Sequence, residues 1–374
     1  MGGTIKGDVN GQEKEIREEE SLPSNKSEEG SFAPRAHTFR PSGGGEGDNR
    51  REVREEVMWF RKAVIKRTGD YIIIYSQGKR YTINYKRRRN VIIVSGGVVE
   101  IKALAEMVKH GTLFIIEDDS GNMSYLLPGE FKVLREQIEA LQDERGIILA
   151  RFFARGSVES KARLLRYLAK GREKDRERLL SSAKKMMGYI SKIESSDDLR
   201  VIMGYEAIAT RFYFSTLGSI LNRYGFAGRD KKGRDLVNAM INYANAIVRA
   251  YALVSVIRAG LFPWIGYLHR PIGDRMSLVL DLAEFAIPPI AHRAVMKLAP
   301  SFYKSEYSYI DGRVIMPDWM RYRLAKLIHA LMNSPCNVFY RGIRILSYEA
   351  LDDIASNVSN FLRKGRKLKP IFLL

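Results

Sequence analysis

The stretch from His269 to Ile287 constrains the fold most, because an apolar helix candidate within it carries two acids. Asp281 and Glu284 are the only polar residues between Leu278 and Ile287. Side chains three positions apart lie on one face of a helix. Burying an unpaired carboxylate is costly, so a buried helix of this kind needs an arginine, a protonated partner or a cation opposite the two acids.

The residues around this helix candidate fit two kinds of partner. His269 precedes the helix across a turn-like Pro-Ile-Gly-Asp segment. Carboxylates with one imidazole and no nearby cysteine suit a hard divalent cation such as Mg²⁺ or Mn²⁺ better than structural zinc. Core ion pairs with Arg275 or Arg293 satisfy the same pattern. The stretch by itself leaves both interpretations open.

Glu206 is a third acid of this kind, because it lies at the head of another apolar and aromatic helix candidate. Only six acids fall between residues 199 and 305. Glu206, Asp281 and Glu284 lie inside apolar helix candidates, whereas the other three lie beside glycine or in charged turns. This contrast favours a metal site over ion pairs, although a glutamate in a first helical turn is also favoured by the helix dipole.

The charge of the chain is uneven and strongly basic. Its 374 residues carry a net charge of +19. After residue 56 there are 53 Lys and Arg against 30 Asp and Glu, an excess that points to a polyanionic partner. No uncharged apolar run approaches the roughly 18 residues of a membrane span, and no signal peptide opens the chain. We therefore expect nucleic acid as the partner, in the cytoplasm and without a membrane.

Cys336 is the only cysteine in the sequence. A single cysteine excludes an intrachain disulfide and any cysteine-cluster metal site. We expect Cys336 to be a core residue.

Sequence texture divides the chain into four segments. Residues 1–56 are rich in Gly, Ser, Glu and Lys with little apolar periodicity, which predicts a disordered tail. Residues 57–130 hold short β-rich runs separated by turn residues, which predicts a small, mostly β domain. Residues 131–362 show helical apolar spacing, and residues 363–374 form a basic C-terminal tail. The predicted fold class is α+β, with a larger, all-helical C-terminal domain.

Six short motifs in the second half of the chain carry a resemblance to a known family. They are Met203-Gly204-Tyr205-Glu206, Tyr213-Phe214, Phe226 to Arg229, Asp235 to Ala239, Gly266 to His269, and Ser277 to Glu284. In this order, within a helical segment that follows a β domain, they resemble the CRISPR-associated protein 1 family of spacer-acquisition integrases. The resemblance covers about residues 58–362.

The resemblance implies an endonuclease and integrase that inserts spacer DNA into a repeat array by attack of a 3′ hydroxyl on a phosphodiester. It implies that Glu206, His269 and Glu284 hold Mg²⁺ or Mn²⁺, with Asp281 beside the ion as a fourth catalytic residue. It also implies a homodimer that binds double-stranded and branched DNA, usually with CRISPR-associated protein 2. The residues predicted to contact DNA are Lys161, Arg163, Tyr213, Arg229 and Arg275.

Two residues depart from the sequence pattern of the family. Three other functions are also compatible with part of the same motifs. Ala207 follows the predicted catalytic glutamate where the family commonly has glycine, and Asn242 replaces a more usual serine; neither change removes a predicted ligand. The alternatives are an integrase of a mobile element, a stand-alone nuclease for branched DNA, and a DNA-binding scaffold without catalysis. We expect no appended DNA-binding module after residue 362, which argues against the mobile element, and the three intact ligand types argue against the scaffold.

Overall fold

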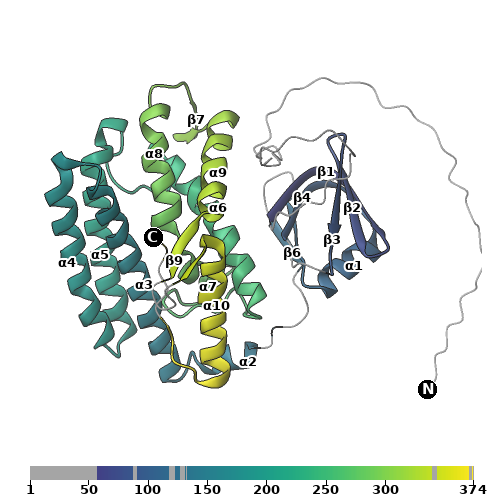
Figure 1. Ribbon diagram of the computed structural model, residues 1–374, viewed down its shortest axis with the longest axis horizontal. Helices are drawn as coiled ribbons and strands as arrows, with labels where there is room; N and C mark the ends of the chain where they lie inside the picture. Colours follow the sequence, from purple (N-terminus) through teal and green to yellow (C-terminus); the bar gives the residue numbers. More distant parts are fainter. Residues whose placement is uncertain are drawn as a thin grey trace, which may run out of the picture. The chain divides into compact units, whose positions relative to one another are not determined.

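A computed structural model describes residues 57–86, 91–117, 123–126, 131, 133–338, 343–369 and 373 (Figure 1). The predicted disordered tail, residues 1–56, lies outside the described residues. So do the last residues of the basic C-terminal tail, with the exception of Leu373. These two predictions therefore stay predictions.

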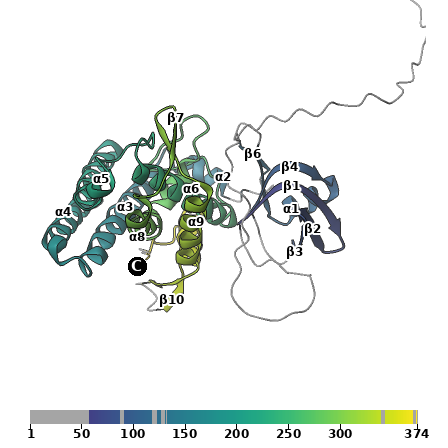
Figure 2. The ribbon, with the colours of Figure 1, turned by 90° about the horizontal axis from the view of Figure 1, so that it is seen from above.

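The first described part of the chain is a six-stranded mixed sheet with one helix, as Figure 2 shows from above. Its strand order is β3-β2-β1-β4-β5-β6, in which β1 pairs with β4 and β4 with β5 in parallel, while the remaining pairs are antiparallel. The elements are β1 (Val57–Thr68), β2 (Tyr71–Ser76), β3 (Lys79–Asn84), β4 (Val91–Val99), α1 (Ile101–Lys109), β5 (Leu113–Glu117) and β6 (Met123–Leu126).

Burial of apolar side chains explains why these runs form strands. In β1 the buried side chains of Ala63 and Ile65 alternate with less buried ones, whereas in β2 the consecutive side chains of Ile72, Ile73 and Ile74 are all buried. Met107 of α1 joins the same core, so the helix covers this apolar face. Successive side chains of a strand point to opposite faces, so consecutive buried residues show that the central strands are covered on both faces. The predicted β domain is therefore confirmed.

The second part is mostly helical, and its long helices begin at aspartate caps. The side chains of Asp143, Asp198 and Asp235 accept hydrogen bonds from backbone N–H groups two or three residues on, at 2.8, 2.7 and 2.8 Å. Such caps satisfy donors that the first helical turn leaves unpaired. The helices are α2 (Leu134–Glu139), α3 (Glu144–Ala169), α4 (Arg176–Glu194), α5 (Leu199–Leu221), α6 (Leu236–Arg258), α7 (Ser277–Ala283), α8 (Arg293–Phe302), α9 (Asp318–Met332) and α10 (Ser347–Lys364).

Two small antiparallel sheets interrupt this helical part, so the prediction of an all-helical domain was wrong in this respect. The first pairs β7 (Ser308–Ile310) with β8 (Arg313–Ile315), and the second pairs β9 (Pro335–Val338) with β10 (Ile343–Leu346). Strands of three or four residues show little period, and these lie inside a segment whose apolar spacing is otherwise helical. Cys336 of β9 is free and buried, as expected.

Helix α6 lies at the centre of the helical part and packs against α7, α9 and α10. Among the described residues it is the one helix long and apolar enough to cross a membrane, and 67% of its most apolar window is buried inside the protein. A core helix meets the same criterion, so this finding is weak evidence for a membrane span. What α6 does provide is a rigid support on which α7 and the loop before it are held.

Candidate active site

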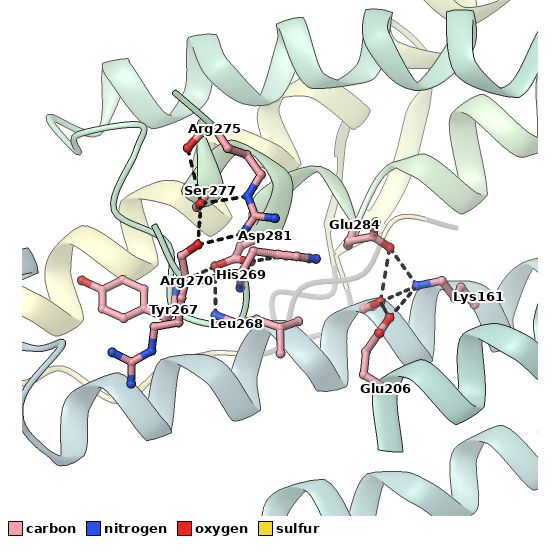
Figure 3. A network of polar contacts seen from close by, with 11 residues as sticks. Lys161, Glu206, Tyr267, Leu268, His269, Arg270, Arg275, Ser277, Asp281 and Glu284 are labelled. Carbon is pink, nitrogen blue, oxygen red and sulfur yellow. Dashed lines mark hydrogen bonds and ion pairs between the residues drawn. The ribbon is translucent and has the colours of Figure 1, made fainter. Parts of the chain in front are cut away.

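Two of the predicted acids meet at a buried lysine. Lys161 of α3 places its Nζ 3.0 Å from Oε1 of Glu206, on α5, and 2.8 Å from Oε2 of Glu284, which follows α7 (Figure 3). The side chain of Lys161 is only 4% exposed, whereas those of the two glutamates are 19% and 22% exposed. Three helices thus bring two carboxylates to one positive charge at the edge of the core.

Hydroxyl groups fix the carboxylate of Glu206 further. Ser157, one turn before Lys161, donates to Oε1 at 2.7 Å, and Thr210, one turn after Glu206, donates to the same oxygen at 2.8 Å. Lys161 also donates to Ser157. Within the described part of the chain, Oε2 of Glu206 and Oε1 of Glu284 accept no hydrogen bond. Each glutamate therefore keeps one oxygen for a ligand.

The ionisation of this group follows from its charges. Burial raises the pKa of Glu206 and of Glu284. The charge and hydrogen bonds of Lys161, with a hydrogen bond from Ser157 at Glu206 and the charges of His269 and Arg249 at Glu284, together hold the pKa of both carboxyls below their usual range. Burial lowers the pKa of Lys161, and the two carboxylates more than reverse this, so its pKa is raised. At neutral pH the group therefore consists of two carboxylates and one ammonium.

Asp281 lies in α7 and is saturated with hydrogen bonds. Its side chain is fully buried. Oδ2 accepts from the backbone N–H groups of Tyr267 and Leu268 at 2.7 and 3.1 Å. Oδ1 accepts from the backbone of His269 at 2.9 Å and lies 2.7 Å from its Nδ1. Because four donors occupy both oxygens, Asp281 holds the loop before α7 in place.

His269 is held by Asp281 in a defined orientation. The hydrogen bond at Nδ1 leaves Nε2 as the outer ring nitrogen, and Figure 3 shows the imidazole extending from Asp281 toward Glu284. A carboxylate behind one ring nitrogen is the usual support of a histidine that binds a metal through the other. Burial lowers the pKa of His269, but Asp281, Glu284 and Glu206 together raise it above its ordinary value.

Two glycines permit the close approaches that build the site. A Cβ on Gly266 would lie 2.6 Å from the carbonyl oxygen of His269, so only glycine fits there. A Cβ on Gly156 of α3 would lie 2.1 Å from the ring of Phe285. This contact seats the residue after Glu284 directly on α3 and brings Glu284 within reach of Lys161.

The alternative prediction, that Asp281 and Glu284 form ion pairs with Arg275 or Arg293, named the wrong partners. Arg275 donates to the carbonyl oxygen of Arg270 at 2.7 Å, and Arg293 donates to the hydroxyl of Tyr167 at 3.0 Å. Neither arginine pairs with Asp281 or Glu284 among the described residues. No group of three or more His, Cys, Asp or Glu side chains in that part of the chain is arranged to hold a metal ion. The Lys161 ammonium lies between the two glutamates, and His269 turns one ring nitrogen to Asp281.

The residues predicted to contact DNA fall into two groups. Lys161 and Tyr213 are 3% and 0% exposed, so a surface contact between either side chain and a DNA backbone does not follow from this structure, and we revise both assignments. Arg163, Arg229 and Arg275 remain partly accessible. Each also donates hydrogen bonds within the protein. Arg163 donates to Glu159, Arg229 donates to Asn238 and Asn242, and Arg275 donates to Ser277 and to the carbonyl oxygen of Arg270.

The sequence did not reveal that Ser157, Thr210 and Lys161 are the partners of the two glutamates. In particular, it did not show that the side chain of Lys161 points into the core. One signal was available, since Ser157 and Lys161 are four residues apart on a helix face that also carries Phe153 and Leu164. A lysine in line with such apolar residues is a candidate for burial. Its partners lie 45 and 123 residues away, so spacing did not reveal them.

Tyr213 instead hydrogen-bonds to a buried histidine, and this pair predicts a pH effect. Its hydroxyl lies 2.7 Å from Nδ1 of His292, and burial lowers the pKa of His292 to about 3. Histidine in an unfolded chain titrates near pH 6.5. Between these values the unfolded state binds more protons, so stability falls as the pH falls. From pH 7 to 5 the loss should reach about 2 kcal/mol in the free energy of unfolding.

Urea unfolding of wild type and His292→Gln at pH 7 and pH 5 measures this effect. The variant should lose about 2 kcal/mol less than wild type between the two pH values, whatever its stability at pH 7. Equal losses in both proteins would show that His292 is not the group responsible.

Comparisons with known proteins agree with this arrangement of motifs. A family model described as CRISPR associated protein Cas1 matches residues 58–328. A curated relative, a CRISPR-associated endonuclease Cas1 of Korarchaeum cryptofilum, is 28% identical over 295 residues, which are 71% of this chain and 85% of the relative.

Solved structures share the fold at low sequence identity. A casposase bound to integration product superposes with a TM-score of 0.67 at 18% identity, over 85% of this chain and 94% of the casposase. A chain of a Cas6-RT-Cas1–Cas2 complex superposes with a TM-score of 0.64 at 15% identity, over 85% of this chain and 36% of that longer chain. The predicted succession of a β domain and a mostly helical domain is thus a known fold.

Proposed function

Because the chain belongs to the CRISPR associated protein Cas1 family, we propose that it is a metal-dependent DNA endonuclease and integrase that inserts spacer DNA into a repeat array. One observation carries the proposal: Glu206 and Glu284, from different parts of the helical domain, are gathered around one buried cation, the ammonium of Lys161, at 3.0 and 2.8 Å, and each keeps a second carboxylate oxygen that accepts no hydrogen bond among the described residues.

The residues present fit a hard divalent cation. Glu206 and Glu284 each offer a carboxylate oxygen that is not used within the described protein, and His269 offers Nε2. Two carboxylates and an imidazole suit Mg²⁺ or Mn²⁺, so these three residues are the proposed ligands. A bound ion of this kind would polarise the scissile phosphate and favour ionisation of the attacking hydroxyl.

The remaining residues of the site position the ligands. Asp281 fixes the ring of His269 through Nδ1 and holds three backbone N–H groups of its loop. We therefore assign Asp281 a positioning role, in place of the catalytic role expected from the resemblance. Ser157 and Thr210 do the same for Glu206, since both donate to its Oε1.

The proposed partners are DNA, a second copy of the chain and Cas2. The basic excess after residue 56 suits the sugar–phosphate backbone of double-stranded and branched DNA. Two solved structures with this fold, one with an integration product and one with Cas2, support DNA and Cas2 as partners. A homodimer would present two active sites to the two ends of one donor. We expect the protein to work in the cytoplasm of a prokaryote.

A second candidate is an integrase of a mobile element, which the structural likeness to the casposase favours. The two functions share the chemistry and differ in the DNA ends and the target. Purified protein, with Cas2 if required, should join a labelled donor to a plasmid carrying a repeat array in the presence of Mn²⁺ or Mg²⁺, and chelation should abolish joining. Joining only to a plasmid without repeats, or only from terminal inverted repeats, would favour the mobile element.

A further inference from the structure

We infer that Lys161 is the resident cation of this site, which holds Glu206 and Glu284 together in the absence of a divalent ion and competes with that ion for them. The inference rests on the proposed metal site and adds a residue to it. Lys161 is then a positioning residue that sets both the stability of the metal-free site and its affinity for metal.

The position of Lys161 supports a role inside the site and not a role in contacts at the protein surface. Lys161 reaches the site from α3, its side chain is 4% exposed, and its Nζ donates to both glutamates and to Ser157. Figure 3 shows the ammonium between the two carboxylates, on the side away from His269. All three donor positions of the ammonium thus have partners inside the protein.

The charges explain why the site needs a cation of its own. Two carboxylates on neighbouring helices repel each other, and Glu284 indeed acts on Glu206 as a like charge. A single ammonium between the two carboxylates leaves the group with one net negative charge. The more distant His269 and Arg249 attract the negative charge of Glu284. Removing one member of a buried, paired group is strongly destabilising, because the others stay buried without compensation.

The same contact opposes a divalent ion. An ion bound by the free oxygens of Glu206 and Glu284 would lie near the ammonium, and like charges at short range repel strongly even at an effective dielectric constant of about 20. Lys161 therefore lowers the metal affinity that the ligands alone would give. In exchange the ligands stay assembled when metal is absent, so the ion meets a preformed pair of carboxylates.

The test uses Lys161→Met, which keeps the length of the side chain and removes its charge. In EDTA its melting temperature should lie at least about 5 °C below wild type. Its affinity for Mn²⁺, measured by electron paramagnetic resonance of the free ion, should be at least about tenfold tighter, with a correspondingly larger rise in melting temperature. Lys170→Met, which changes an exposed lysine just after the same helix, is the matched control and should match wild type in both measurements.

A second variant covers the case in which Lys161→Met does not fold in EDTA. Lys161→Met combined with Glu206→Gln has the same net charge at the site as wild type, so it should regain most of the lost stability without tighter Mn²⁺ binding. The double variant could instead be as unstable as Lys161→Met. That result would overturn the inference, because it would show that the loss of stability comes from altered packing and not from the unbalanced charge.

Mn²⁺ binding separates failure of the inference from failure of the metal site. If Glu206→Gln weakens Mn²⁺ binding but Lys161→Met leaves it unchanged or weaker, the metal site stands and the competition is refuted. If wild type and Glu206→Gln bind Mn²⁺ equally, the proposed metal site itself is wrong, and the competition falls with it.

Discussion

Glu206→Gln and Glu284→Gln should each slow metal-dependent cleavage and joining of DNA by at least about 1,000-fold, a loss of roughly 4 kcal/mol in transition-state stabilisation. Glutamine keeps the size of the side chain but removes the charge that would hold the ion. DNA affinity should stay within about threefold of wild type, because many Lys and Arg side chains share the phosphate contacts. Rates under single turnover and binding at matched salt measure the two quantities.

Graded controls accompany these variants. Asp281→Asn removes no proposed ligand but weakens the support of His269 and of the loop before α7, so a smaller loss of about 10- to 100-fold is expected. Glu177→Gln changes an exposed glutamate of α4 and should leave activity unchanged. Because Glu206→Gln and Glu284→Gln each change a partner of Lys161, rates are compared well below the measured melting temperatures. Near-normal turnover of both glutamate variants with Mg²⁺ or Mn²⁺ would contradict the ligand assignment.

Local sequence patterns predicted the β domain because its strands follow one another between turn residues, and most of them have five residues or more. β2 (Tyr71–Ser76), for example, lies between turns at Gly69 and Gly78, and both glycines have positive φ, at 59° and 71°. Only glycine adopts such angles at little cost. The strands β7 and β9 escaped prediction because three or four residues show little period and these lie inside a segment of helical spacing; the side chains of β7 are also all exposed.

The acids of the site were predictable for a different reason. A carboxylate in an apolar helix is costly unless something offsets it, so Glu206, Asp281 and Glu284 stood out without any knowledge of the fold. Their separate roles were not predictable. Asp281 lies within α7, which ends at Ala283, and faces the loop of His269, whereas Glu284 caps the helix and turns to α3.

Long-range contacts account for what sequence could not supply. Lys161 and Tyr213 were predicted to contact DNA, and both are buried in the structure. Whether a helix residue faces solvent depends on which helices pack around it, and those helices lie far away in sequence. For Lys161 the deciding partners are on α5 and at the end of α7.

A donor ending in a 3′ dideoxynucleotide should not be joined to target DNA at all, whereas the same donor with a 3′ hydroxyl should be. In the proposed reaction the 3′ oxygen forms a new bond to the target phosphorus, the bond from that phosphorus to the target's own 3′ oxygen breaks, and the proton of the attacking hydroxyl ends on the oxygen that leaves. The number of phosphodiester bonds is conserved. Hydrolysis uses water instead and does not depend on the donor end.

Gel analysis of a labelled donor and a supercoiled plasmid with repeats distinguishes these reactions, since joining moves the label into the plasmid band. All the candidate functions predict salt-sensitive DNA binding, so binding alone does not choose among them. Nicking of the plasmid at equal rates with either donor, and no joined product with Cas2 present, would replace the integrase by a nuclease. Neither nicking nor joining with Mg²⁺ or Mn²⁺ would replace it by a DNA-binding scaffold, and the two glutamates around Lys161 would then be a structural ion-pair cluster.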